Sequence, residues 1–416
     1  MSALAAGCFL ASPSAAWAGG PAGAPPAGGG RCAQPPPAPN LPVGDPGPDL
    51  LWPQSRLGLS PAGVWYLTRG KGVTVAVVDT GVDKANPAFG PDTVLAGPSV
   101  VDPGDSGDYD CDGHGTAVAA AVAGRENGVF GFSGAAPEAT ILPIRQTYLT
   151  GRPGSSVKLA NAIRTATAGG ARIIDISIAA TEDSPQLRAA VQYALASDVL
   201  IVAAAGADGL AATAGAPAAG AQKDVKYYPA AIAGVLAVGA VDRTGAIAAS
   251  FAQQGTGVML AAPGGRMAVP ALGSPAALTA AQGTGFASAF VAGTAALVMA
   301  YRPALHNWQV AQRLVETADR PSAGASGSGG DAGTVAWGIV DPYRAVTVNL
   351  AGEGRPDPSF APGARAAEFE ATVPGRDRTA EHVALGVAGG GVLALAIPVA
   401  TAAARRGRSR GTRAGA

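Results

Sequence analysis

Two ionisable side chains stand in short, glycine-flanked motifs that could carry acid–base chemistry. Asp79 follows the β-branched run 73–78 and begins Asp79-Thr80-Gly81, and His114 lies in Gly113-His114-Gly115, at the start of a helical pattern. The carboxyl end of a parallel strand is where α/β proteins place ligands and catalytic groups. An imidazole held by a carboxylate can serve as the general base for a nucleophile. Each motif alone is also explained by a capped turn or a structural histidine.

The segments around these motifs alternate between two kinds of pattern. Short β-branched runs alternate with longer stretches of helical spacing, which predicts a parallel sheet with helices on both faces. The predicted strands are 73–78, 173–178, 199–203 and 235–241, and the predicted helices are 116–123, 157–167, 184–195 and 287–299. Asp79 is therefore expected at the edge of the sheet where the strands end.

The two motifs together resemble the subtilase family of serine proteases, whose catalytic residues follow the order Asp, His, Ser. The resemblance covers about 51–346 and implies a subtilisin-like three-layer α/β fold with a mainly parallel central sheet, with Asp79 and His114 as catalytic positions. Further matching motifs are Gly134-Ala-Ala-Pro-Glu-Ala139, Tyr228-Pro-Ala230, Leu260-Ala-Ala-Pro-Gly264 and Phe290-Val-Ala-Gly-Thr294.

Two motifs narrow the resemblance to mycosins, the membrane-anchored subtilases of type VII secretion systems. These are Trp52-Pro-Gln54 and Ile141-Leu-Pro-Ile-Arg-Gln146. The resemblance implies an N-terminal extension that wraps the domain, a disulfide between Cys32 and Cys111, and the type VII secretion membrane complex as partner. It implies no cofactor and no metal. From the residues alone, the two cysteines outside the expected leader could also be buried free thiols.

The chain departs from the family pattern at two catalytic positions. The family has Gly-Thr-Ser where this chain has Gly283-Thr284-Gly285, and Ala-Ala-Gly-Asn where it has Ala204-Ala-Gly-Ala207. Without its nucleophile a triad retains about 10³–10⁴-fold rate enhancement over water, and losing an oxyanion donor costs about 10²–10³. We therefore expect negligible peptide hydrolysis, with Gly285 a degenerate nucleophile position and Ala207 a degenerate oxyanion position. Thr284 and Ser288 are not expected to substitute as nucleophile.

The two ends of the chain predict its location. Residues 1–18 have an apolar stretch followed by Ala16-Trp17-Ala18, which is typical of a secretory signal peptide. Residues 383–404 carry no charge and could cross the ~30 Å hydrocarbon core, and the arginines after them favour a cytoplasmic C-terminus. A buried core helix is the alternative for this run. The expected segments are the signal peptide (1–18), an N-terminal extension (19–60), the subtilase domain (61–346), a linker (347–382), a transmembrane helix (383–404) and a basic cytoplasmic tail (405–416).

The charge of the chain limits its partners. Lys plus Arg and Asp plus Glu both number 29, so the net charge is about zero. The absence of a clustered basic face argues against a nucleic-acid partner.

Three functions stay open at this level. We favour a catalytically impaired structural or peptide-binding component of type VII secretion, because the anchored topology accompanies a doubly altered site. In this first reading a peptide could pair with Asp175-Ile-Ser-Ile178 as an added strand without being cleaved. In the second, a substitute nucleophile makes the chain an active serine endopeptidase that processes secreted proteins. In the third, the chain is a cell-surface peptide binder without a secretion partner.

Overall fold

The structure, a computed structural model, describes residues 49–351 and 353, apart from 103, 126–130, 151–153, 207, 211–224, 247, 249–256, 273–276 and 321–337. The expected signal peptide, the extension up to residue 48, the 383–404 helix and the basic tail lie outside these residues. So does the linker beyond residue 353.

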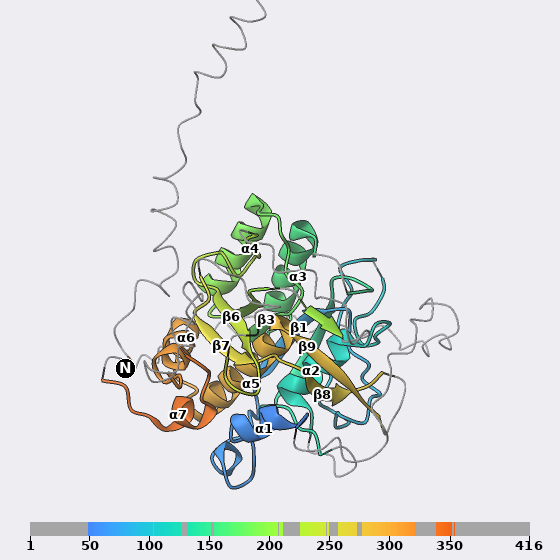
Figure 1. The fold of residues 1–416 in the computed structure, drawn as a ribbon. Helices are drawn as coiled ribbons and strands as arrows, with labels where there is room; N and C mark the ends of the chain where they lie inside the picture. The colour runs from blue at the N-terminus through green and yellow to red at the C-terminus, as the bar shows by residue number, and fades with distance from the viewer. Residues whose placement is uncertain are drawn as a thin grey trace, which may run out of the picture.

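A six-stranded parallel sheet forms the centre of the domain (Figure 1). Its order is β2-β1-β3-β4-β6-β7, and every neighbouring pair runs parallel. The strands are β1 (Thr74–Asp79), β2 (Thr140–Arg145), β3 (Ile173–Ile176), β4 (Leu200–Ala204), β6 (Leu236–Val241) and β7 (Leu260–Pro263). This confirms the expected α/β class with a mainly parallel central sheet, and β1 places Asp79 at the edge where the strands end.

Helices cover both faces of this sheet, as Figure 1 shows. Alternate residues of β1 separate two cores: Val75 and Val77 pack toward α2 and α5, whereas Ala76 and Val78 pack toward α3 and α4. The helices are α1 (Trp52–Arg56), α2 (His114–Ala123), α3 (Ser156–Ala168), α4 (Pro185–Ala196), α5 (Thr284–Tyr301), α6 (Asn307–Glu316) and α7 (Pro342–Thr347), with a 3₁₀ turn at Val64–Tyr66. Successive side chains of the strands point to opposite faces of the sheet, and both faces are buried. The domain therefore has three layers, with the sheet between two layers of helices.

Local side-chain caps explain where three of these helices begin. Ser155 accepts a hydrogen bond from the Lys158 amide at α3, and Ser184 accepts one from the Leu187 amide at α4. Asp341 does the same at the start of α7. Such caps satisfy amides that the first helical turn leaves without an internal partner.

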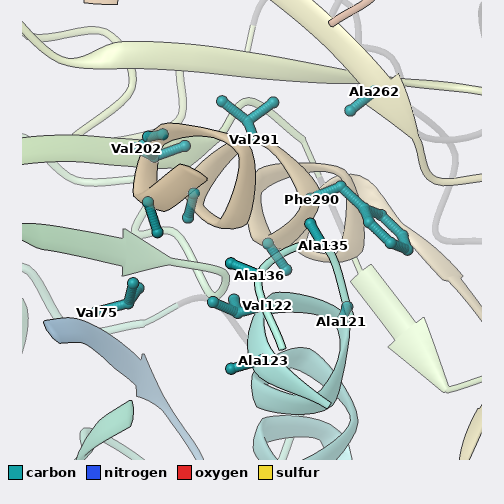
Figure 2. Close-up of a cluster of buried hydrophobic side chains, with 14 of the residues drawn as sticks. Val75, Ala121, Val122, Ala123, Ala135, Ala136, Val202, Ala262, Phe290 and Val291 are labelled. Carbon is teal, nitrogen blue, oxygen red and sulfur yellow. The ribbon is translucent and has the colours of Figure 1, made fainter. Parts of the chain in front are cut away.

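Small side chains bring α2 and α5 close together (Figure 2). Ala121 and Val122 of α2, with Ala135 from the loop that follows, lie against the Phe290 region of α5. An ideal Cβ built at Gly293 would lie 2.7 Å from the Cβ of Ala135, closer than real Cβ atoms approach. Glycine at this position therefore permits the close contact of the middle of α5 with the end of α2 and the loop after it.

Helix α5 is also the one helix, within the described part of the chain, that is long and apolar enough to cross a membrane. Its most apolar window is 89% buried inside the domain. It is therefore a core helix, and it extends beyond the predicted range 287–299 at both ends. The predicted transmembrane helix 383–404 is a different segment, outside the described residues.

Several elements differ from the sequence expectations. A second sheet, of antiparallel strands in the order β5-β9-β8, was not expected; its strands are β5 (Asp208–Leu210), β8 (Met267–Pro270) and β9 (Leu278–Gly283). Predicted strand 173–178 ends at Ile176 instead, because the chain then turns to bring Ser177 to the end of β1. His306 is the N-cap residue of α6 and remains exposed.

The described end of the N-terminal extension is attached to distant parts of the domain. The Trp52 indole donates to the carbonyl of Arg266, 3.0 Å away, and the amide of Ala268 donates to the carbonyl of Leu50. These bonds attach the start of the described chain to β8.

Candidate active site

The structure brings Asp79 and His114 into direct contact. Nδ1 of His114, the first residue of α2, lies 2.8 Å from Oδ2 and 3.0 Å from Oδ1 of Asp79, the last residue of β1. An ionised carboxylate only accepts hydrogen bonds, so Nδ1 carries the proton and Nε2 is left as the basic nitrogen. Both side chains are 0% exposed. The two residues that the sequence singled out therefore form one buried pair, with the imidazole oriented as a general base requires.

Glycines permit this close approach of β1 and α2. An ideal Cβ at Gly115 would lie 2.1 Å from the carbonyl oxygen of Gly81 and 3.0 Å from Oδ1 of Asp79. The N-cap Gly113 has φ = 97°, in the left-handed region that favours glycine. The glycines around His114 thus let the first turn of α2 sit directly on the turn after β1.

Asp79 accepts further hydrogen bonds that hold its carboxylate in place. The amide of Thr80 donates to Oδ1 at 2.6 Å, and the hydroxyl of Ser177 donates to Oδ2. Ser177 follows β3 and is buried. In the sequence, Ser177 falls within the segment expected to pair with a peptide, and no local signal marks it as a partner of Asp79.

A second buried carboxylate, Asp110, holds the start of α2. It accepts hydrogen bonds from the hydroxyl of Thr80 (2.9 Å), the amide of Gly113 (3.0 Å) and both the amide and hydroxyl of Thr116 (2.9 and 2.7 Å). Burial raises the pKa of the Asp110 carboxyl above its usual value. Asp110 was not among the predicted site residues, although an Asp shortly before the start of a helix is a recognisable capping signal. Asp110 therefore ties the turn after β1 to the helix that carries His114.

Arg145, the last residue of β2, supports the same turn from the other side. Its Nε donates to the carbonyl of Thr80 at 3.0 Å, Nη1 lies 2.9 Å from Oδ2 of Asp105, and Nη2 donates to the carbonyl of Tyr109. Its guanidinium carbon lies 3.6 Å from the centre of the Tyr109 ring, a cation–π contact.

Asp105 is the carboxylate that balances Arg145. Burial raises its pKa, but hydrogen bonds from Tyr148 and Tyr109 and from the amide of Ser106, together with the charge of Arg145, outweigh burial. The net result is a pKa below the usual value. This ion pair was not expected from the sequence, because Arg145 ends an otherwise apolar strand.

The first turn of α5 lies against His114 and carries Gly285 at the position where the family has serine. Gly285 is buried at the second position of the helix, and the ring of Phe286 packs against the imidazole with centroids 5.1 Å apart. Ser288 is also buried, and its hydroxyl donates to the carbonyl of Gly285 at 2.9 Å. This bond within the helix supports the expectation that Ser288 does not replace the missing serine.

Two of the sequence-predicted positions lie outside the described residues: Ala207, the degenerate oxyanion position, and Cys32. Cys111 is buried and disulfide-bonded, and it is the one cysteine within the described part of the chain. Its predicted pairing with Cys32 stays a prediction. Among the described residues, no group of three or more His, Cys, Asp or Glu side chains could hold a metal ion.

The segment after β3, expected to pair with a peptide, already forms hydrogen bonds within the domain. The carbonyl of Ile178 accepts from Nε2 of Gln146 at 2.9 Å, and the carbonyl of Ala179 accepts from the amide of Gly154 at 2.8 Å. Ala180 and Tyr228 exchange two backbone hydrogen bonds of 2.8 and 2.7 Å. An added strand would have to compete with these bonds.

A parallel sheet of this order, with a carboxylate ending β1 and a paired imidazole starting α2, defines a subtilisin-like α/β protein. The model of the subtilase family matches residues 70–338, and the chain belongs to that family. It is similar to two mycosins of Mycobacterium tuberculosis (strain ATCC 25618 / H37Rv). Mycosin-4 is 36% identical over 374 residues, which cover 82% of this chain and 80% of the relative. Mycosin-1 is 34% identical over 404 residues, which cover 87% and 86%.

Solved structures agree with this relationship. The MycP3 protease from the type VII (ESX-3) secretion system aligns with a TM-score of 0.57 at 36% identity, covering 79% of this chain and 98% of that one. A chain in the periplasmic assembly of the ESX-5 inner membrane complex aligns with a TM-score of 0.58 at 30% identity, covering 78% and 90%. The chain is thus a mycosin-like subtilase related to type VII secretion.

Proposed function

We propose that this chain is a catalytically impaired subtilase that acts as a structural component of a type VII secretion assembly. One observation carries the proposal: the imidazole of His114 is oriented by Asp79, but the position beside it that should hold a nucleophile is Gly285. A general base accelerates peptide cleavage only if it has a nucleophile to activate. The expected loss of the oxyanion amide at Ala207 adds to the same conclusion.

The burial of the pair supports a structural role for it. His114 is fully buried, and Phe286 packs against its ring. Even without a nucleophile to activate, the bond between Nδ1 of His114 and Asp79 is a buried hydrogen bond that holds α2 to β1.

The hydrogen bonds after β3 favour a structural role over peptide binding. Strand addition uses free backbone donors and acceptors at an edge. Here the carbonyls of Ile178 and Ala179 already accept hydrogen bonds from Gln146 and Gly154. We therefore rank a peptide in the groove second to a partner that contacts the outside of the domain.

The relatives suggest the partner and the location. One neighbour in structure is part of a periplasmic assembly of an inner membrane complex, so we propose the type VII secretion membrane complex as the partner. We further propose that residues 383–404 anchor the chain, that the folded domain lies outside the cytoplasm with the basic tail inside, and that Cys32 pairs with Cys111 there.

Labelling of the full-length protein with a fluorophosphonate tests the loss of activity. Related active subtilases, run in parallel, should be labelled, whereas this chain should not be. Hydrolysis of an unstructured peptide that disappears in the His114→Ala variant would refute the proposal and favour the endopeptidase reading.

Affinity purification from the native membrane tests the partner. Co-purification of membrane-embedded secretion components with the full-length protein is expected for a structural role. Recovery of the chain without such components would contradict it and favour a free-standing surface protein.

A further inference from the structure

A fully buried arginine lies at the end of the domain opposite the candidate site. Arg313 of α6 is 0% exposed, and a buried guanidinium is strongly unfavourable unless a carboxylate pairs with it. Its Nε donates to Oε1 of Glu353, whose side chain is 20% exposed. Its Nη2 has no hydrogen-bond partner among the described residues. Within the described chain, Glu353 is the carboxylate that pairs with this buried charge.

The same arginine binds the backbone on the way to Glu353. Nη1 of Arg313 donates to the carbonyls of Ala345 and Val348, each 2.8 Å away. These contacts hold the chain where it leaves α7. We call residues 346–351 and 353 the C-terminal strap.

A second arginine, at the end of α5, also binds the strap. Arg302, the C-cap residue of α5, donates through Nε to the carbonyl of Val346 at 3.1 Å. Its Nη1 lies 3.9 Å from Oε2 of Glu353. On α6, Nε2 of Gln309 donates to the backbone carbonyl of Glu353 at 2.8 Å. Two helices therefore hold the strap, and Glu353 is bound both by its side chain and by its backbone.

We propose that the C-terminal strap is a latch that fastens the end of the domain to α5 and α6, with Glu353 as the residue that closes it. The contacts to carbonyls would form with almost any sequence in the strap. The carboxylate of Glu353 is specific, because it neutralises Arg313, and its removal leaves a buried charge without a partner. The chain continues from Glu353 toward the uncharged run 383–404. A force applied to the chain from the side of residues 383–404 therefore acts on the contacts of Glu353 before it acts on the rest of the domain.

The position of the latch makes its opening separable from the candidate site. Arg302 follows the last residue of α5, whereas Gly285 is the second residue of this 18-residue helix. At 1.5 Å per residue the helix is about 27 Å long. Release of the strap should therefore leave the hydrogen bonds of Asp79 and His114 intact, whether or not the site is catalytically impaired.

Hydrogen exchange of the full-length protein, comparing wild type with Glu353→Gln, tests the latch. The substitution keeps the size of the side chain and removes its charge, which weakens charge-assisted bonds to two arginines. We expect exchange of strap amides, such as Val348, which donates to the carbonyl of Arg344, to accelerate about ten- to a hundredfold. Amides of β1 should keep their wild-type rates.

Glu138→Gln is the matched control. Glu138 is a surface carboxylate whose side chain is 48% exposed and lies 3.9 Å from Arg69, so its substitution should leave exchange in the strap unchanged. Arg313→Lys, which keeps the charge but loses the forked contacts, should open the strap to a similar extent. The proposal fails if Glu353→Gln leaves strap exchange within about twofold of wild type. It also fails if β1 and the strap accelerate equally, because Glu353 would then stabilise the whole domain and not a separable latch.

Discussion

Replacing Asp79 by alanine tests whether the buried pair is part of the framework of the domain. The substitution removes the acceptor of three donors: the amide of Thr80, Nδ1 of His114 and the hydroxyl of Ser177. All three surround a side chain that is 0% exposed, so water cannot replace the lost carboxylate without reorganisation. Alanine should therefore lower the free energy of unfolding substantially.

The geometry sets the size of this effect. Each buried donor left without an acceptor costs about 1–3 kcal/mol, which gives about 3–9 kcal/mol for three. The hydroxyl of Ser177 can turn toward the carbonyl of Val78, 3.5 Å away, so we expect the lower part of this range, about 3–5 kcal/mol. Domains are stable by about 5–15 kcal/mol, and a loss of this size should lower Tm by about 10 °C.

Thermal and urea unfolding of Asp79→Ala, followed by circular dichroism, provide the measurement. Asp83→Ala is the control, because the half-buried Asp83 carboxylate lies in the same loop and accepts from the amide of Ala85. That variant should lose no more than about 1 kcal/mol. Residues kept for catalysis are often replaced with no loss of stability or with a gain. An unchanged or higher Tm for Asp79→Ala would therefore refute the structural reading of the pair.

Three further variants address the site and its surroundings. Gly285→Ser combined with Ala207→Asn should restore slow hydrolysis of an unstructured peptide, about 10²–10³-fold faster than Gly285→Ser alone; an inactive double variant would show that other parts of the groove have also diverged. Gly115→Ala should destabilise the domain by about 1–3 kcal/mol in urea unfolding, because its Cβ would lie 2.1 Å from the carbonyl of Gly81; an unchanged midpoint would contradict the close contact. Asp105 has a lowered pKa in the fold, so its contribution to stability is present above the unfolded value near 3.8 and is lost as the pH falls through the folded value. In Asp105→Asn, the free energy of unfolding should fall less steeply below about pH 4 than in the wild type. Urea unfolding at a series of pH values measures this, and an unchanged pH dependence would count against the ion pair.

The sequence predicted the elements whose patterns are local. The β-branched run 73–78 predicted β1 to within one residue, and the run 199–203 did the same for β4. The helical pattern 184–195 is α4 shifted by one residue, since Ser184 is its cap and not its first turn. Glycine-flanked His114 was placed correctly at the start of a helix.

What the sequence did not predict depends on partners distant in the chain. Arg145 ends an apolar strand, and only the folded arrangement shows that Thr80, Asp105 and Tyr109 surround it. Ser177 lies in a run that reads as a continuing strand, but its contact with Asp79 ends that strand. The antiparallel sheet was missed because its strands are short and rich in small residues, which have weak strand preference.

The contacts that assemble the candidate site join segments far apart along the chain. The bond between His114 and Asp79 spans 35 residues, that between Arg145 and Thr80 spans 65, and that between Ser177 and Asp79 spans 98. Closing such loops costs conformational entropy before the contacts between distant segments can form. Domains with many such contacts therefore fold slowly. A newly made chain would therefore spend an extended interval with its central strands exposed before the sheet is complete. During that interval a chaperone or protease would encounter the protein as an unfinished sheet.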